Sequence, residues 1–253
     1  MPSWLSFDRV ATVYDATRSL APRPMARLLG VLVDELQGKW VLEVGVGTGR
    51  YAVPLQKSGI RVVGADISRR MVGLGLAKGL RDVVFADGAR LPFAAGSFDM
   101  TTTNHVLHLI PDWRDVLGEI TRVTREMYFT VIEQSDPGDS ILREYDELVK
   151  AAGFIYNHPG VFERDLPKLL KPDIVMPAGP FRSTAPASSL LDELDARVYS
   201  SQWDVPEEIH RGVMRTLRGK WHGKYLDRTF TLEVTFWRAD RLPELAKAPA
   251  QTW

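Results

Sequence analysis

The most informative stretch of this chain is residues 40–50, which read WVLEVGVGTGR. Its first half is a short apolar run of the kind that forms a buried strand. Gly45, Gly47 and Gly49 follow at alternate positions. Because glycine has no Cβ atom, these positions allow the backbone to turn sharply and to approach a ligand closely. The stretch therefore predicts a strand that passes through a ligand-binding turn into a helix.

The neighbouring segments have the periodicity of a strand–helix–strand unit. Residues 23–36 place five apolar side chains on one helical face, and Gly38 ends that helix. Residues 60–65 form a second apolar strand, which ends at Asp66. This acid lies 21 positions after Gly45. Such a spacing suits a carboxylate that accepts hydrogen bonds from the hydroxyls of a ribose.

Other interpretations of the glycine turn are possible. The dinucleotide-binding fingerprint requires a sixth-position glycine, where this chain has Arg50, and the Gly-Lys-Ser/Thr ending of a P-loop is absent. A tight turn without any ligand is the plainest alternative. The flanking strand, the following helix and the distant acid together favour a bound nucleotide-like ligand over a bare turn.

The remaining patterns predict the α/β class. Further strands are expected at residues 82–86, 98–103 and 128–132, with a helix at residues 111–123. Strands and helices that alternate at this length predict a parallel sheet covered by helices on both faces. Residues 229–237 alternate apolar and polar side chains, which is typical of an antiparallel edge strand. We expect a three-layer, Rossmann-like sheet of seven strands, mostly parallel, with one antiparallel edge strand and helical cap elements.

The second half of the chain carries weaker signals. Helices are expected at residues 139–152, 188–199 and 206–217, whereas residues 153–186 are rich in proline and glycine and fit no single element. The residues from Arg241 onward are expected to form a frayed tail.

Length and composition fit one elaborated domain. The chain has 253 residues, of which 45% are hydrophobic and 25% are charged, as in ordinary globular proteins. We expect a single domain over residues 1–253, with an N-terminal arm over residues 1–22. A partly helical substrate cap is expected within residues 136–226, above the carboxyl ends of the strands, where open α/β sheets bind ligands.

Charge and cysteine content exclude several classes of function. Lys+Arg and Asp+Glu both number 32, so the net charge provides no general attraction to nucleic acid or anionic membranes. The chain has no cysteine, which excludes disulfides, a thiolate nucleophile and a Cys-based zinc site. No apolar run suits a signal peptide or a membrane span, so a cytoplasmic location is expected.

Several motifs resemble the signatures of one enzyme family. Residues 41–50 resemble the first signature of class I S-adenosylmethionine-dependent methyltransferases, and residues 63–68 (VGADIS) are similar to the second. Residues 86–93 (ADGARLPF) resemble the third, and residues 7–15 (FDRVATVYD) are similar to the opening of the small-molecule branch. The resemblance covers about residues 7–133. It implies S-adenosylmethionine as the cofactor and methyl transfer as the activity.

The resemblance also implies roles for individual residues. Asp66 would hold both ribose hydroxyls, and Asp87 would accept a hydrogen bond from the adenine amino group. Met71 would pack on the adenine, although plain core packing is an equal alternative for it. The full set of residues implied to bind the cofactor is Glu43, Gly45, Gly47, Gly49, Asp66, Ile67, Met71, Asp87, Ala89, Asn104 and His105.

Methyl transfer from a sulfonium needs little catalytic apparatus. The protein mainly has to align the acceptor about 3 Å from the methyl carbon and exclude water. A base is needed only if the nucleophile starts protonated. His105 and His108 lie just past the fourth strand, and histidine is the residue type that most readily serves as a base near neutral pH; Tyr14 is a further candidate. These three are the predicted catalytic residues, with simple packing in an apolar segment as the alternative for both histidines.

Substrate contacts are predicted at Arg18 and Glu133, where an anchoring contact and a water-exposed carboxylate are the respective alternatives. No metal site is expected, because two of the three nearest candidates, Asn104 and Gln134, are uncharged amides. The Asn/Asp-Pro-Pro-Tyr/Phe run of enzymes that methylate nucleobase amines or glutamine amides is missing after the fourth strand.

The leading hypothesis is therefore methyl transfer to an oxygen, nitrogen or carbon atom of a small molecule. A basic run over residues 211–228, with Trp221 and Tyr225 interleaved, would suit RNA. A solvated helix face explains the same run, and the overall neutrality of the chain argues against a nucleic-acid partner. RNA or protein methylation, and cofactor binding without catalysis, remain alternatives.

Overall fold

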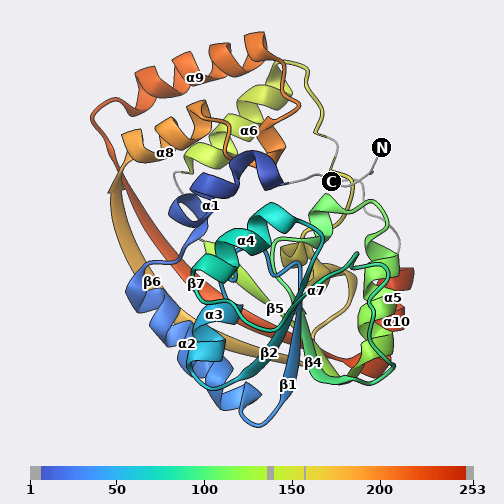
Figure 1. The fold of residues 1–253 in the computed structure, drawn as a ribbon. Coiled ribbons are helices and arrows are strands. Elements are labelled where there is room, and N and C mark those ends of the chain that lie inside the picture. The colour runs from blue at the N-terminus through green and yellow to red at the C-terminus, as the bar shows by residue number, and fades with distance from the viewer. Residues whose placement is uncertain (1–6, 136–139, 157, 249–253) are drawn as a thin grey trace.

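The computed structural model describes residues 7–135, 140–156 and 158–248. A seven-stranded sheet with the order β3-β2-β1-β4-β5-β7-β6 runs through its centre (Figure 1). The strands are β1 (Trp40–Val44), β2 (Arg61–Asp66), β3 (Val83–Phe85), β4 (Phe98–Thr103), β5 (Thr124–Ser135), β6 (Ile174–Pro186) and β7 (Tyr225–Arg238).

The sheet has the predicted class but differs in its edge. Strands β1 to β5 are parallel, and β7 runs antiparallel to both β5 and β6. The seven-stranded, mostly parallel sheet is thus confirmed. The edge position predicted for residues 229–237 is wrong, because β6 lies outside β7. β6 comes from the unassigned stretch and contains three prolines. Proline is tolerated on an edge strand, where its missing N–H leaves no ladder bond unmade.

Helices cover both faces of the sheet, as predicted. One face packs against α2 (Pro22–Leu36), α3 (Ala52–Lys57) and α4 (Arg69–Ala77). The other packs against α5 (Trp113–Val123), α7 (Leu166–Leu169) and α10 (Leu242–Lys247). The expectation of a frayed tail is wrong for residues 241–248, because α10 buries Leu242 and Leu245 against the cluster that contains α5; residues 249–253 lie outside the described residues. Short 3₁₀ turns lie at Phe7–Val10, Leu107–Leu109, Glu163–Asp165, Ser200–Gln202 and Ala239–Arg241.

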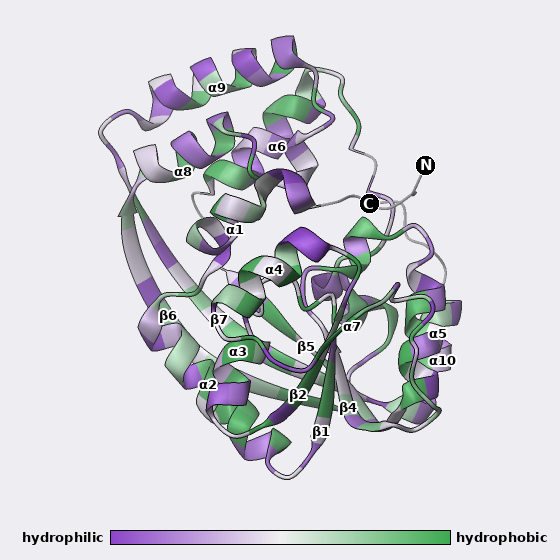
Figure 2. Cartoon of the chain, viewed as in Figure 1, coloured by the Kyte–Doolittle hydropathy of each residue, from purple (hydrophilic) through white to green (hydrophobic). Residues whose placement is uncertain are grey.

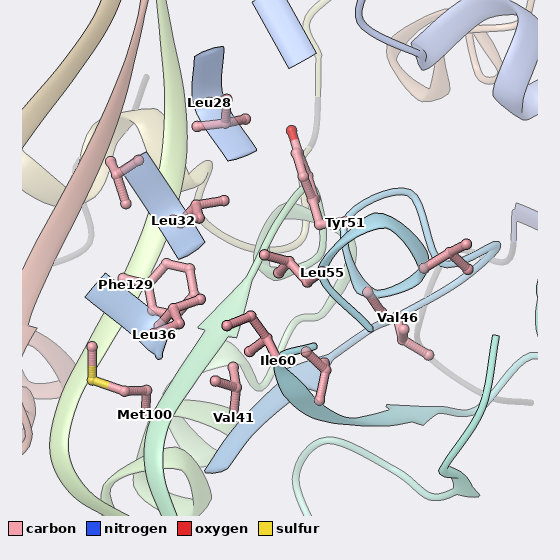
Figure 3. Packing of buried hydrophobic residues seen from close by; sticks show 14 of the residues in the cluster. Leu28, Leu32, Leu36, Val41, Val46, Tyr51, Leu55, Ile60, Met100 and Phe129 are labelled. Carbon is pink, nitrogen blue, oxygen red and sulfur yellow. The ribbon is translucent and has the colours of Figure 1, made fainter. Parts of the chain in front are cut away.

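The periodicity of α2 explains how one face is sealed. Leu28, Leu32 and Leu36 recur every fourth residue, so they share one side of the helix and are at most 1% exposed. Figure 3 shows them packed toward Leu55 and Phe129 from α3 and β5. Burial of each such side chain contributes about 1.5–3 kcal/mol before conformational entropy is subtracted. In Figure 2 the central strands are accordingly hydrophobic, and the helices present mixed faces.

A third group of helices forms its own small core. α6 (Ile141–Ala151), α8 (Ala187–Asp195) and α9 (Glu207–Trp221) pack on one another through buried residues such as Tyr145, Leu191 and Leu217. Their residue ranges agree closely with those of the three helices predicted for this half of the chain. Figure 1 shows them beyond the end of the sheet toward which β1 and β2 run, with α1 (Ala11–Arg18) beneath them. None of the helices in the described residues is long and apolar enough to cross a bilayer.

Candidate functional site

A cavity opens where β1, β2 and β4 end, beneath α1. Most of the predicted site residues line it, although they come from separate parts of the chain. Those that line the cavity are Tyr14, Glu43, Gly45, Gly47, Asp66, Ile67, Met71, Asp87, Asn104 and His105. The sequence motifs therefore converge on one space.

Outside the cavity lining lie five other predicted residues: Arg18, Gly49, Ala89, His108 and Glu133. Arg18 donates to the carbonyl of Val198 at 3.2 Å, with its guanidinium 4.0 Å from the centre of the Tyr199 ring. Glu133 is exposed near the end of β5 and pairs with Arg228, so the structure gives no support to its predicted substrate contact. The backbone N–H of Ala89 already donates to Asp87 Oδ1 at 3.0 Å.

The three glycines of the turn have different neighbours. A Cβ atom on Gly45 would lie 2.2 Å from a methyl carbon of Val106, and one on Gly49 would lie 2.7 Å from a methyl carbon of Val53. Gly47 has a φ of +52°, and a Cβ there would meet only ordinary van der Waals neighbours at the cavity wall. The missing Cβ atoms of Gly45 and Gly49 thus leave room for the side chains of Val106 and Val53. The cofactor contact predicted for Gly49 is not supported by its position.

Asp66 connects the second strand to the glycine turn. Its Oδ2 accepts from the backbone N–H of Gly47 at 2.7 Å, and its Oδ1 accepts from that of Ser68 at 2.7 Å. Ser68 caps α4 as expected, accepting from the Met71 N–H at 3.0 Å. Burial raises the pKa of Asp66, and these backbone donors oppose the rise. Each carboxylate oxygen keeps a further lone pair for a ligand in the cavity.

The N-terminal helix is attached to this same turn. Asp15 of α1 accepts from Thr48 Oγ1 at 2.7 Å and from Lys78 Nζ at 2.6 Å. Upstream of the helix, Asp8 accepts from Ser68 Oγ. These contacts hold α1 across the mouth of the cavity and bring Tyr14 into its wall.

Asn104 has two roles in the fold. Its Nδ2 donates to Thr102 Oγ1 at 3.1 Å, and its Oδ1 accepts from the backbone N–H of Val131 at 3.0 Å. The amide therefore ties the ends of β4 and β5 together while it lines the cavity. Glu133 and Gln134 lie on exposed backbone beyond it, and no group of three or more acidic, histidine or cysteine side chains within the described ranges is placed to hold a metal ion.

Glu43 is an almost fully buried carboxyl in the cavity wall. It is 3% exposed, and its Oε2 has no hydrogen-bond partner among the described residues. Burial raises the pKa of Glu43 to about 8, against the lowering effects of a backbone hydrogen bond from Ala52 and of the Arg50 charge. The group is consequently protonated over much of the neutral range.

Replacing Glu43 with glutamine should change how stability depends on pH. The folded-state pKa of Glu43 is raised above the ordinary 4.5. The stabilisation that Glu43 contributes is therefore complete below about pH 4.5 and is lost as the pH rises through about 8. The free energy of unfolding of the wild type should fall by up to about 1.4 kcal/mol per pH unit in this window because of Glu43. Urea midpoints across the window measure the slope. An identical slope in Glu43→Gln would contradict the assignment.

His105 presents its ring to the cavity from an unusual backbone position. Its φ is +60°, in the left-handed region that non-glycine residues adopt rarely and that often marks functional sites. Although the accessible surface of His105 is that of an exposed residue at the cavity, desolvation by the surrounding protein and the charge of Arg50 lower the pKa of His105 to about 4. The imidazole is thus neutral near pH 7 and only weakly basic, which limits its predicted role as a general base.

His108 lies outside the cavity, in a buried cluster behind it. Its ring stacks on Phe162 with centroids 4.6 Å apart, and its Nδ1 lies 3.8 Å from Glu163 Oε2. Simple packing, the alternative to catalysis, describes this position better than direct contact with a reacting group.

Glu163 is the residue that sequence reasoning missed most clearly. Its Oε1 accepts from the backbone N–H of Val106 at 2.7 Å and from that of Leu107 at 3.0 Å. The side chain is buried, yet these donors and His108 hold the pKa of Glu163 down at about 2. Glu163 thus fixes the loop that carries His105. It comes from the unassigned stretch, where no periodicity marked it.

Arg50 and Tyr51 also line the cavity, together with the apolar side chains of Val106, Leu109 and Ile110. In the sequence, Arg50 is notable only because it replaces the sixth-position glycine of the dinucleotide fingerprint. Its position directly after the last glycine of the turn is the signal in the sequence that it lies at the cavity.

The basic run over residues 211–228 is largely neutralised by neighbouring acids. Arg211 pairs with Glu207, Lys220 pairs with Glu144 at 2.8 Å, and Arg218 pairs with two aspartates of α8. The contacts of Lys220 and Arg218 join α9 to α6 and α8, so these two residues of the run take part in helix packing.

Comparisons with known proteins agree with this geometry. A family model described as a methyltransferase domain matches residues 42–132. Nocamycin O-methyltransferase of Saccharothrix syringae is 39% identical over 128 residues, covering 47% of this chain and 46% of that protein. Demethylmenaquinone methyltransferase of Clavibacter sepedonicus is 34% identical over 155 residues, covering 57% and 63% respectively. The chain spans about half the length of the curated relatives it matches.

Solved structures share the fold at low sequence identity. A protein described as a methyltransferase from an antibiotic biosynthesis pathway of Anabaena variabilis has a TM-score of 0.55 and 18% identity, covering 83% of this chain and 96% of its own. A methyltransferase-like protein of Bacillus halodurans has a TM-score of 0.54 and 17% identity, covering 83% and 98%. The family match and the predicted motifs in one cavity show a methyltransferase domain over residues 42–132, on a fold shared with class I, Rossmann-like methyltransferases; this domain implies S-adenosylmethionine as the cofactor.

Proposed function

We propose that this protein transfers a methyl group from S-adenosylmethionine to an oxygen, nitrogen or carbon atom of a small molecule. The observation that carries the proposal is the single cavity in which Asp66 and Asp87 occupy one region and Tyr14 and His105 also contribute to the wall. Both curated relatives are named for small organic molecules, nocamycin and demethylmenaquinone.

The residues present fit the cofactor. Asp66 would accept from the ribose hydroxyls, since its oxygens retain lone pairs beyond the two backbone bonds. Glu43 Oε2 is a buried acceptor without a partner in the described chain, and the cofactor's amino-acid end carries an ammonium group that would satisfy it. Gly47 leaves the cavity wall open beside Met71, where an adenosine could lie. The bound sulfonium supplies a reactive methyl group.

The protein's own contribution is positioning and exclusion of water. α1 closes over the cavity through Asp15, and the loop held by Glu163 forms another wall. We propose that the helices α6, α8 and α9 act as the substrate cap within residues 136–226, and that residues 1–22 act as an arm. A narrow, water-excluding site of this kind accelerates transfer mainly by alignment.

Calorimetry on the purified chain tests the cofactor half of the proposal. S-adenosylmethionine and S-adenosylhomocysteine should both bind, and NAD should not. Asp66→Ala should weaken binding of both by about 100-fold or more, because two charge-assisted hydrogen bonds to the ribose are lost. Asp34→Ala, which removes an exposed carboxylate from α2, is the matched control and should bind normally.

Transfer of a radiolabelled methyl group tests the other half. Incorporation into members of a small-molecule panel, with none into bulk RNA or protein, is the expected result. Tight cofactor binding without transfer to any class would favour the non-catalytic alternative. A folded protein that binds neither sulfur compound would overturn the proposed function.

A further inference from the structure

Arg50 occupies an unusual electrostatic position in the cavity wall. Among the described residues, it is the only lysine or arginine that lines this cavity, and its Nε is buried without a hydrogen-bond partner. Its guanidinium lies 5.0 Å from the centre of the neighbouring Tyr51 ring. A partly buried guanidinium has a high desolvation cost unless an anion offsets it.

The neighbours of Arg50 do not supply that anion. Glu43 is an acid of the same wall, but burial raises the pKa of Glu43 to about 8, and its unpartnered Oε2 is assigned above to the cofactor's ammonium group. Asp66 is engaged with the Gly47 and Ser68 backbone, in the region assigned to the nucleotide. No ion pair joins Arg50 to any carboxylate of the described chain within 4.0 Å.

A second arginine adds to the positive charge at this end. The contacts that the described residues give Arg18 are carbonyl oxygens and the Tyr199 ring, which are uncharged. The charges of Arg50 and Arg18 both act on Tyr14 and on His105, so Arg18 adds positive charge near this part of the wall although its side chain does not line the cavity. The apolar side chains of Val106, Leu109 and Ile110 line the same cavity.

We propose that Arg50, supported by Arg18, binds an oxyanion of the methyl acceptor, so that the substrate class is an apolar molecule bearing an ionised hydroxyl or a carboxylate. This inference rests on the proposed function and specifies its acceptor. The acceptor's oxygen attacks the methyl carbon, the carbon–oxygen bond forms, and the carbon–sulfur electron pair stays on sulfur. The acceptor brings no proton to this step, because it is already ionised. A strong general base is then unnecessary, in agreement with the weakly basic imidazole of His105.

Binding of a matched pair of probes to protein saturated with S-adenosylhomocysteine tests the proposal. para-Nitrophenolate, at a pH above the pKa of the free phenol, should bind at least about tenfold more tightly than neutral para-nitroanisole. Arg50→Met should abolish this preference, and Arg50→Lys should retain part of it. Arg211→Met removes an exposed, ion-paired arginine of α9 and should leave the preference intact.

A second arm distinguishes the acceptor from the cofactor as the source of the oxyanion. The affinity ratio of S-adenosylhomocysteine to methylthioadenosine, which lacks the carboxylate, should be the same in wild type and Arg50→Met. If Arg50→Met removes the advantage of S-adenosylhomocysteine, Arg50 binds the cofactor's own carboxylate and the proposal is overturned. Equal binding of phenolate and anisole to the wild type also overturns it. Failure of S-adenosylhomocysteine to bind at all would instead count against the proposed function.

Discussion

Alanine at position 160 should destabilise the fold by at least about 3 kcal/mol, although it adds a single methyl group. A Cβ atom on Gly160 would lie 1.9 Å from the carbonyl oxygen of Leu107 and 2.5 Å from that of Ile110. Both obstacles are backbone atoms of the loop that lines the cavity, so no side-chain rotation relieves the clash. Gly160 also donates its N–H to the His108 carbonyl at 3.3 Å, and this contact would be lost as the segments separate.

Urea denaturation of Gly160→Ala against wild type measures the effect. Gly118→Ala is the matched control, because Gly118 lies in α5 and a Cβ atom there would have nothing within 4 Å. Alanine in an open helical position should be neutral or stabilise by about 0.5–1 kcal/mol. A Gly160→Ala protein as stable as this control would show that the two segments are not locked together.

Glu163→Ala should cost about 3 to 5 kcal/mol at neutral pH, because it removes a buried, ionised acceptor from its partners. The backbone N–H groups of Val106 and Leu107 would lose their acceptor, and His108 would lose the carboxylate that lies 3.8 Å from its Nδ1. Glu163→Gln keeps a side-chain oxygen of the same shape and should cost less, about 1 to 2 kcal/mol. Equal losses in the two variants would mean that the charge, rather than the acceptor oxygen, dominates.

The pH dependence of stability separates these contributions. The folded-state pKa of Glu163, about 2, is lower than its ordinary value of 4.5. Its stabilisation is therefore present above about pH 4.5 and is lost as the pH falls toward about 2. Acid unfolding of the wild type should take up more protons in this window than that of Glu163→Gln. Superimposable acid profiles would contradict the assignment of a buried, ionised Glu163.

Local patterns predicted the elements that carry the cofactor motifs. The apolar run before Gly45 forms β1, Asp66 ends β2, and Ser68 caps α4 as its position before the helix indicated. Each of these features depends on residues within one turn or one strand. Side-chain spacing and backbone preference therefore suffice to define them.

The sequence by itself thus determined the parallel half of the sheet, the nucleotide-type end of the cavity and the family resemblance. Only the tertiary structure decided the surroundings of Arg50 and the edge of the sheet. Glu163 meets Val106 across 57 positions of chain, and β6 pairs with β7 despite its prolines. The structure alone shows that Arg50 lines the cavity and that its buried Nε has no hydrogen-bond partner among the described residues. Contacts of this kind depend on distances in space between distant segments, and no local periodicity encodes them.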